Sequence, residues 1–157
     1  AGCCGVAAEA TRRRKGGIIP AEGGGEKILV DRVPHGVGGA IAAWNFPLAR
    51  CARKIGPALA AGNTIVVKPQ ELSPLSALAL AALAQEVGLP EGVLNIVTGD
   101  GPDVGVALVA HADVPLITMT GSTPAGKKIM AAAAEHLKEV RLELGARRRL
   151  LLWKMRT

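Results

Sequence analysis

The feature that most constrains the fold is a short β-branched run that leads directly into a helix pattern. Thr64–Lys68 reads Thr-Ile-Val-Val-Lys and is closed by Pro69. Beyond it, the apolar residues between 75 and 83 recur at i, i+3, i+4, i+7 and i+8, the spacing of one helix face, and Ser73 is the expected N-cap. A strand that leads into a helix and then into another strand predicts a crossover unit of a parallel sheet.

The same alternation continues on both sides of this unit. A small-residue strand is expected at Val37–Ala43, followed by a helix from Pro47 to about Ala61 that Pro57 should kink or restart. We therefore predict an α/β fold, an open Rossmann-like parallel sheet with helices on both faces, which binds ligands at the carboxyl ends of its strands. The remaining expected elements are a strand at Leu94–Val97, a helix at Val104–Ala110, a strand at Pro115–Met119, a helix to about Leu137 capped by Ser122 or Thr123, and a strand at Val140–Leu144.

The two ends of the chain lack this regularity. Residues 1–15 show no convincing periodicity, although Val6–Ala10 could open a helix, and Ile28–Val33 is a short β-type run. We expect an irregular segment at 1–15, one domain at 16–145 and a tail of different character at 146–157. A chain of 157 residues is long enough to bury a core for one domain.

The charge distribution argues against a nucleic-acid partner. The formal net charge is +6, but residues 16–145 carry 10 Lys/Arg against 12 Asp/Glu, a net of −2. A nucleic-acid binder needs basic residues across one face and aromatic side chains on which bases stack. Aromatic residues make up 2% of the chain, so we expect no such partner. The positive excess comes from the two ends: Arg12, Arg13, Arg14 and Lys15, then Arg147, Arg148, Arg149, Lys154 and Arg156.

The cysteines and the hydropathy indicate a soluble cytoplasmic protein. Cys3 and Cys4 are adjacent and Cys51 stands alone, and neither these nor the three histidines have metal-ligand spacing. An odd number of cysteines without a signal peptide favours a reducing compartment. No apolar run approaches the roughly 20 residues that span a bilayer. We expect no metal and no membrane partner.

Two segments at strand ends suggest a nucleotide site, each with a plainer alternative. Gly121, Ser122 and Thr123 come between a strand and a helix, where free amide donors would face an anion; an ordinary N-cap fits equally well. Lys68 and Glu71 could bind the hydroxyls of a ribose, although an exposed surface ion pair is the simpler interpretation. The glycines at 99, 101 and 105 have one residue too many for the dinucleotide fingerprint and indicate only a turn.

A third segment suggests catalysis. Asn45 lies between Trp44 and Phe46 at a strand-to-helix junction. Its side-chain amide could donate a hydrogen bond to a developing oxyanion, or it could cap the helix.

Taken together, these segments resemble the aldehyde dehydrogenase superfamily from about Gly16 to Gly145. Two segments are most similar to the lactaldehyde and succinate-semialdehyde branch of this superfamily. They are Met119 before Thr-Gly-Ser, and Gly-Ile-Ile-Pro at 17–20. The segments that carry the resemblance, in order, are Trp44-Asn45-Phe46-Pro47, Pro57-Ala58-Leu59-Ala60-Ala61-Gly62-Asn63-Thr64, Lys68-Pro69-x-Glu71, Gly88-Leu89-Pro90-x-Gly92-Val93, Gly121-Ser122-Thr123 and Leu142-Glu143-Leu144-Gly145.

The resemblance implies an NAD-dependent oxidation of an aldehyde to a carboxylic acid through a cysteine thiohemiacetal and thioester. It implies Asn45 as the oxyanion donor and Glu143 as the general base. The cofactor would be NAD, in this family's Rossmann-like cofactor domain, and the intact enzyme would be a homo-oligomer that acts on a small-molecule aldehyde. The residues implied in cofactor binding are Lys68 and Glu71 at the adenosine ribose, Gly121 and Ser122 at the pyrophosphate, and Trp44.

The chain departs from the family at two places in its functional segments. Ala43 stands where the family commonly has proline before Trp-Asn, which loosens a turn. More seriously, the family's nucleophile lies downstream of Leu-Glu-Leu-Gly, whereas all three cysteines here lie upstream. We therefore interpret the chain as a truncated cofactor-domain fragment that lacks the nucleophile and is inactive by itself.

The tail suggests a reason for this departure. The family continues after Leu-Glu-Leu-Gly with a Gly-Lys, a proline, a β-strand and an acidic end, whereas residues 146–157 are basic and leucine-rich. Read one base earlier with permissible codons, the same nucleotides can spell Gly-Lys-Ala-Pro-Val-Val-Val-Val-Glu-Asp-Ala-Asp, where several positions depend on codon choice. We hypothesise a one-base deletion and an out-of-frame tail. The alternative is a natural basic amphipathic helix.

Two functions of different classes therefore remain open. One is a fragment of an aldehyde-oxidising oxidoreductase, and the other is a stand-alone nucleotide-binding module without catalysis. The coding sequence downstream separates them, because a cysteine-containing family segment in the shifted frame would support the first.

Overall fold

A five-stranded parallel sheet forms the centre of the molecule. The structure is a computed structural model that describes residues 2–145, and the tail at 146–157, with its frameshift hypothesis, lies outside that range. The strand order is β5-β4-β3-β6-β7, and every pair of neighbours is parallel. The chain order reverses at β3, which has β4 on one side and β6 on the other, so that a topological switch point lies there. The strands are β3 (Val37–Ile41), β4 (Thr64–Lys68), β5 (Leu94–Ile96), β6 (Leu116–Gly121) and β7 (Glu139–Leu144).

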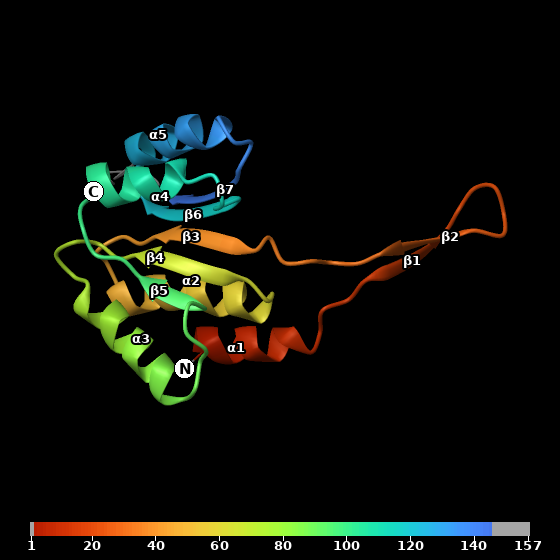
Figure 1. Ribbon diagram of the computed structural model, residues 1–157, viewed down its shortest axis with the longest axis horizontal. Coiled ribbons are helices and arrows are strands. Elements are labelled where there is room, and N and C mark those ends of the chain that lie inside the picture. The colour runs from red at the N-terminus through yellow and green to blue at the C-terminus, as the bar shows by residue number, and fades with distance from the viewer. Residues whose placement is uncertain (1, 146–157) are drawn as a thin grey trace, which may run out of the picture.

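Helices cover both faces of this sheet (Figure 1). One face carries α2 (Pro47–Ala60) and α3 (Leu75–Glu86), with α1 (Gly2–Thr11) packed against α2. The other face carries α4 (Val106–Ala110), which continues from the single π-helical turn η1 (Gly101–Gly105), and α5 (Thr123–Ala134). This arrangement confirms the predicted Rossmann-like α/β fold.

Two apolar clusters, one on each face, hold these layers together. On the α2–α3 face the most deeply buried residues include Ile65 and Val67 of β4 and Cys51 of α2, all with an exposed fraction of at most 1%. On the α4–α5 face Ile117 of β6 is fully buried beside Val109 of α4. Successive residues of a strand point to opposite faces of the sheet. Because both faces of this parallel sheet carry apolar side chains, a layer of helices covers each of them.

The central strand is built from small residues because the opposite face leaves no space for larger ones. A Cβ atom added to Gly39 of β3 would lie 2.7 Å from Ile117 Cδ1 and 3.0 Å from Val114 Cγ1. At the neighbouring Gly38, whose Cβ would point to the other face, the nearest atom is the Thr64 carbonyl oxygen at 3.7 Å. Gly39 therefore permits close packing of β3 against the α4–α5 layer.

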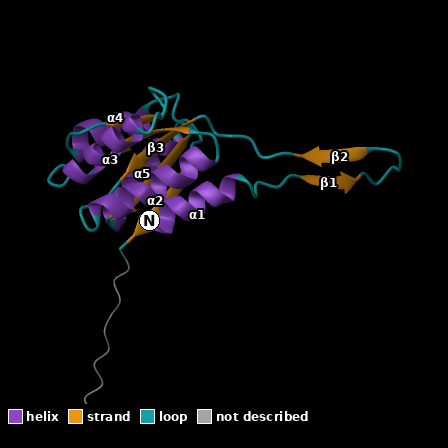
Figure 2. Ribbon diagram, turned by 90° about the horizontal axis from the view of Figure 1, so that it is seen from below, coloured by secondary structure: helices purple, strands orange, loops and turns teal. Residues whose placement is uncertain are grey.

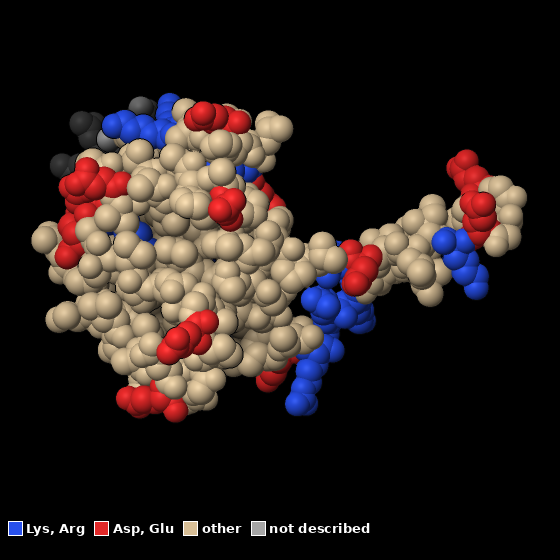
Figure 3. All heavy atoms as spheres, viewed as in Figure 1, with Lys and Arg blue, Asp and Glu red and all other residues tan. Residues whose placement is uncertain are grey.

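A two-stranded arm projects from this body (Figures 1 and 2). β1 (Gly17–Pro20) pairs antiparallel with β2 (Lys27–Val30), and every residue of both strands is exposed. The exposed residues include large apolar side chains, among them Ile18, Ile19, Ile28 and Leu29. Basic side chains gather where the arm leaves the body, whereas acidic ones are scattered over the body itself (Figure 3).

The structure corrects several expectations for individual elements. Residues 2–11, expected to be irregular, form α1, because the helix gains a packing partner in α2 and buries Ala7 there. β1 was not expected, and β2 ends at Val30 rather than at residue 33. α5 ends at Ala134 and not near residue 137, because Leu137 adopts a left-handed φ of 49°.

Two further differences concern α3 and α2. Ser73 does not cap α3, since the N-cap is Pro74 and the Ser73 hydroxyl instead donates to Gln70 Oε1. α2 does not restart at Pro57 but continues to Ala60. Pro57 lies in the last turn of α2, so a break at Pro57 would shorten the helix only slightly.

Candidate functional site

The predicted functional residues come from separate segments of the chain and reach the same edge of the sheet. Asn45 follows β3, Lys68 is the last residue of β4, Ser122 follows β6, and Glu143 is the penultimate residue of β7. In a parallel sheet all carboxyl ends lie at one edge, and this edge is where open α/β sheets bind ligands. The fold therefore brings together residues that are up to 98 positions apart (45 to 143).

Lys68 and Glu71 form a polar pair at the end of β4. Lys68 is 3% exposed, and its Nζ donates to Glu71 Oε2 and to the carbonyl of Pro69, both at 3.3 Å. The burial of Lys68 rules out the alternative of a fully exposed surface pair. The backbone amide of Glu71 and then the Lys68 ammonium, both as hydrogen-bond donors, lower the pKa of the Glu71 carboxyl. A carboxylate that is charged and half-exposed beside a fixed ammonium is suited to accept from the hydroxyls of a sugar.

The start of α5 is a capped helix terminus at the carboxyl edge of the sheet. Ser122 is the N-cap, with extended backbone, and its Oγ accepts from the Ala125 amide at 3.3 Å. Residues 122–124 are exposed, and the first-turn amide of Thr123 points out of the helix, as amides at helix N-termini do. The predicted N-cap is thus confirmed, and it is compatible with an anion at the same place.

Gly121 is the last residue of β6 and lies beside Met119. A Cβ atom at Gly121 would meet the terminal methyl of Met119, and this flexible side chain can move aside. Packing at Gly121 therefore does not demand glycine. Its φ is not in the left-handed region, so backbone conformation does not demand glycine.

Asn45 does not cap α2. The N-cap of that helix is Phe46, which adopts a left-handed φ of 55° and makes no side-chain capping bond. Trp44 and Phe46 on either side are both about three-quarters exposed at the carboxyl edge (72% and 73%). The capping alternative for Asn45 is thus wrong, and its amide is half-buried at the edge without a helix to cap.

Glu143 lies among cations that the sequence analysis did not identify. Its Oε2 accepts from Thr120 Oγ1 and from Arg50 Nη1, both at 3.3 Å, and its Oε1 lies 3.6 Å from Arg53 Nη2. Both arginines belong to α2, so these contacts connect the first helix after β3 to the last strand. Their spacing in the sequence shows only that the cations share one helix face, since Arg50, Arg53 and Lys54 fall at i, i+3 and i+4.

Lys54 is the third cation of this helix face. It is 8% exposed, and its Nζ donates to Thr118 Oγ1 of β6 at 3.2 Å. Burial lowers the pKa of Lys54, and Arg50 and Arg53 act in the same direction, whereas Glu143 opposes the change. Lys54 thus places its Nζ against the middle of β6.

The described cysteine side chains are poorly placed for nucleophilic chemistry. Cys51 on α2 is fully buried in the α2–α3 cluster, and burial raises the pKa of its thiol, so the reactive thiolate is disfavoured. Cys4 is exposed, but it lies on α1, which carries none of the predicted site residues.

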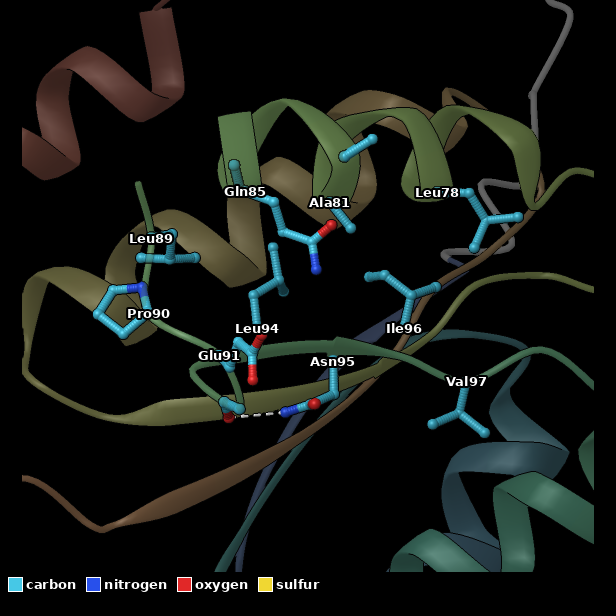
Figure 4. A pocket seen from close by; sticks show the side chains of 13 residues that line it. Leu78, Ala81, Gln85, Leu89, Pro90, Glu91, Leu94, Asn95, Ile96 and Val97 are labelled. Carbon is cyan, nitrogen blue, oxygen red and sulfur yellow. Dashed lines mark hydrogen bonds between the residues drawn. The ribbon is translucent and has the colours of Figure 1, made fainter. Parts of the chain in front are cut away.

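A cavity of about 600 Å³ lies away from this edge, between α3 and β5 (Figure 4). Gln85 and Asn95 point into it, and Asn95 donates to the Gly92 carbonyl at 2.8 Å. Its lining includes none of the predicted site residues. Within residues 2–145 no helix has both the length and the apolar composition needed to cross a membrane.

Fold and site together define a class. The sheet is parallel, has a topological switch point and carries helices on both faces, and a helix N-terminus lies at its carboxyl edge. This is the architecture of a Rossmann-like cofactor domain. The chain belongs to the aldehyde dehydrogenase family, whose family model matches residues 1–155.

Individual relatives agree with this assignment and with the predicted branch. Mitochondrial succinate-semialdehyde dehydrogenase of Arabidopsis thaliana is 55% identical over 138 residues, 88% of this chain and 26% of the plant enzyme. The crystal structure of lactaldehyde dehydrogenase from Escherichia coli has a TM-score of 0.88 at 47% identity, covering 90% of this chain and 30% of that one. A double mutant of betaine aldehyde dehydrogenase from Staphylococcus aureus, solved in complex with NAD+, has a TM-score of 0.86 at 36% identity, covering 89% and 28%. The chain thus spans between a quarter and a third of these relatives.

Proposed function

We propose that this chain is the cofactor-binding part of an NAD-dependent aldehyde dehydrogenase, with residues 16–145 as the binding domain. The intact enzyme would oxidise an aldehyde to a carboxylic acid. The observation that carries the proposal is the meeting of Asn45, Lys68, Ser122 and Glu143 at one edge of the sheet. Their chemistry is complementary, with amide and ammonium donors, an anion-suited helix terminus and a carboxylate base.

The residues at this edge fit a nicotinamide dinucleotide. The first turn of α5 at Ser122 would receive the pyrophosphate, and Lys68 with Glu71 would hold the adenosine ribose. When bound, the cofactor supplies the acceptor for the hydride. A 42% identical relative from Picrophilus torridus is named as an NADP(+) enzyme, so family membership leaves the choice of nucleotide open. The negative charge of Glu71 favours NAD, because it would repel a phosphate on the ribose.

The remaining residues would act on the substrate side. Asn45 would donate its amide N–H to the oxygen of the aldehyde as negative charge develops there. Glu143 would take a proton from the water that releases the acid from its thioester. Neither cysteine side chain that the structure describes is suited to form this thioester, since Cys51 is buried and Cys4 lies on α1.

We also propose that the intact enzyme is a cytoplasmic homo-oligomer. The arm offers apolar side chains such as Ile18 and Leu29 that the body of this chain does not cover. Exposed apolar surface of this kind is typical of protein interfaces. The free, exposed thiol of Cys4 is suited to a reducing compartment.

Calorimetric titration of the chain with NAD tests the cofactor site. Lys68→Met should abolish measurable binding, because it removes the buried ammonium at the carboxyl edge. Lys138→Met is the matched control, since Lys138 is also buried (9% exposed) but precedes β7, at the opposite edge of the sheet. Equal loss of binding in both variants would contradict the assignment, provided that unfolding curves show both to be folded.

An assay of NADH formation with small aldehydes tests the catalytic part. We expect no turnover by this chain, and turnover by a protein in which the frame is restored beyond Gly145. Steady turnover by the chain alone would show that one of its own cysteines is the nucleophile. Absence of turnover in the restored protein, with NAD binding intact, would favour the stand-alone nucleotide-binding module.

A further inference from the structure

One glutamine holds the turn between β4 and α3. Gln70 is half-buried in this turn, and its backbone carbonyl accepts from the Ser73 amide at 3.1 Å. Its side-chain Oε1 accepts from the Leu72 amide at 2.9 Å and from the Ser73 hydroxyl at 3.3 Å. Glu71 lies between Gln70 and Leu72, so these hydrogen bonds fix the stretch of backbone that carries its carboxylate.

The same contacts determine which way the Gln70 amide faces. A backbone N–H can only donate, so the atom that meets the Leu72 amide must be the side-chain oxygen. The side-chain nitrogen is then a donor that the turn does not use. The backbone amide of Glu71 and the Lys68 ammonium lower the pKa of the Glu71 carboxyl, and the Gln70 side chain adds to them as a further donor. Gln70 thus accepts from the turn and donates toward the carboxylate.

The Glu71 carboxylate has few other restraints. Its side chain is 46% exposed, and within residues 2–145 Lys68 is the one cation at ion-pair distance, 3.3 Å from Oε2. An exposed glutamate with a single ionic contact keeps much of its rotamer freedom. Recognition of two sugar hydroxyls requires the carboxylate in one orientation, so a second restraint on Glu71 has a direct use at the ribose.

We propose that Gln70 is a positioning residue that holds the Glu71 carboxylate toward the adenosine ribose and thereby sets the preference between NAD and NADP. This inference rests on the proposed function, because it concerns the ribose that Lys68 and Glu71 would bind. A carboxylate held in this orientation accepts from the ribose hydroxyls of NAD and opposes the additional phosphate of NADP. A carboxylate released from Gln70 can turn away from that phosphate, and the preference for NAD then decreases.

Gln70→Met tests this role, because methionine has nearly the same length as glutamine but offers neither the amide acceptor nor the amide donor. Gln85→Met is the matched control, since it makes the same change in the last turn of α3, beside the cavity of Figure 4 and away from the carboxyl edge. Calorimetric titration of the whole chain with NAD and with NADP measures the preference. Carbon-13 magnetic resonance of the Glu71 carboxyl measures its pKa without nucleotide, which a purely structural role of Gln70 would leave unchanged.

We expect Gln70→Met to lower the ratio of the NADP to the NAD dissociation constant about tenfold, the order of effect of one charge-assisted hydrogen bond. The same substitution should raise the pKa of the Glu71 carboxyl, and Gln85→Met should change neither quantity. Ser73→Ala removes only the hydroxyl that donates to Gln70 Oε1, so it should lower the ratio by a smaller factor. This variant also provides the test if Gln70→Met does not fold.

The contrary outcomes separate this inference from the proposed function. An unchanged ratio in Gln70→Met would overturn the inference and leave the proposed function standing. A raised Glu71 pKa without a change in the ratio would also overturn it, because Gln70 would then affect only the ionisation of the carboxylate. An equal change in Gln85→Met would show that the effect is not specific to Gln70. If the unmodified chain binds neither nucleotide, the proposed function fails and the inference fails with it.

Discussion

Replacement of Gly39 by alanine should destabilise the protein, whereas the same change at Gly38 should not. The two positions are neighbours on β3 and neither has a left-handed φ, so backbone conformation demands glycine at neither of them. They differ in what a Cβ would meet. At position 39 it would enter the α4–α5 face, 2.7 Å from Ile117 Cδ1, 3.0 Å from Val114 Cγ1 and 3.3 Å from Leu108 Cγ.

The size of the effect follows from two opposing contributions. Overpacking of a filled core costs typically 1–3 kcal/mol, and loss of glycine flexibility in the unfolded chain returns about 0.4–1 kcal/mol. Gly39→Ala should therefore lower the free energy of unfolding by about 1–2 kcal/mol. At Gly38 the nearest atoms are 3.7 and 3.9 Å away, so only the favourable contribution remains.

Urea denaturation of the two variants measures this difference. Ile117→Val offers a second check, because it removes the Cδ1 atom that Gly39→Ala would strike. By itself this change costs about 0.5–1.5 kcal/mol as a lost buried methyl, but in the Gly39→Ala background it should cost less or even stabilise. A Gly39→Ala variant as stable as Gly38→Ala would refute the packing argument, and additive effects of the two substitutions would show that these side chains do not meet.

Three further predictions concern charged and reactive groups. Calorimetry should show that NAD binds more tightly than NADP, because the Glu71 carboxylate would repel the additional phosphate of NADP. Two unit charges about 4 Å apart interact by about 4 kcal/mol at an intermediate dielectric before screening. Glu71→Ser should therefore reduce the preference for NAD. Iodoacetamide should modify Cys4 in the native chain but leave Cys51 unmodified until the chain unfolds, as mass spectrometry would reveal, because Cys51 is buried and its pKa is raised. Burial lowers the pKa of Lys54 below its ordinary 10.5, so the unfolded chain binds the Lys54 proton more tightly than the folded chain does. The free energy of unfolding should therefore rise with pH between the lowered pKa and 10.5. Lys54→Met should remove this increase.

The sequence was sufficient to predict the parallel sheet because its elements carry local signals. Thr64–Lys68 was predicted with its observed bounds, since β-branched residues and the following proline mark both its type and its end. The edge at which Asn45, Lys68, Ser122 and Glu143 meet also followed from the alternation of strands and helices, because this alternation implies parallel strands with one common carboxyl edge.

Elements without a local signal were missed. β1 exposes both faces to solvent and therefore lacks the alternation of apolar and polar residues that predicts a strand; it exists because β2 pairs with it. α1 depends on its packing against α2, which only the folded chain provides. The contacts of Arg50 and Arg53 with Glu143 join positions about 90 residues apart along the chain (50 and 53 to 143), and no pattern in the sequence specifies such a pairing.

The central place of β3 determines the order in which the sheet can assemble during synthesis. β3 leaves the ribosome before both of its neighbours in the sheet. β4 follows soon after, whereas β6 follows only after α3, β5 and α4. The half-sheet β3–β4–β5 can therefore form first, since contacts between nearby segments close at lower entropic cost. Until Ile117 arrives with β6, the face of β3 at Gly39 lacks its nearest apolar neighbour, and the nascent chain exposes an open strand edge at the future switch point.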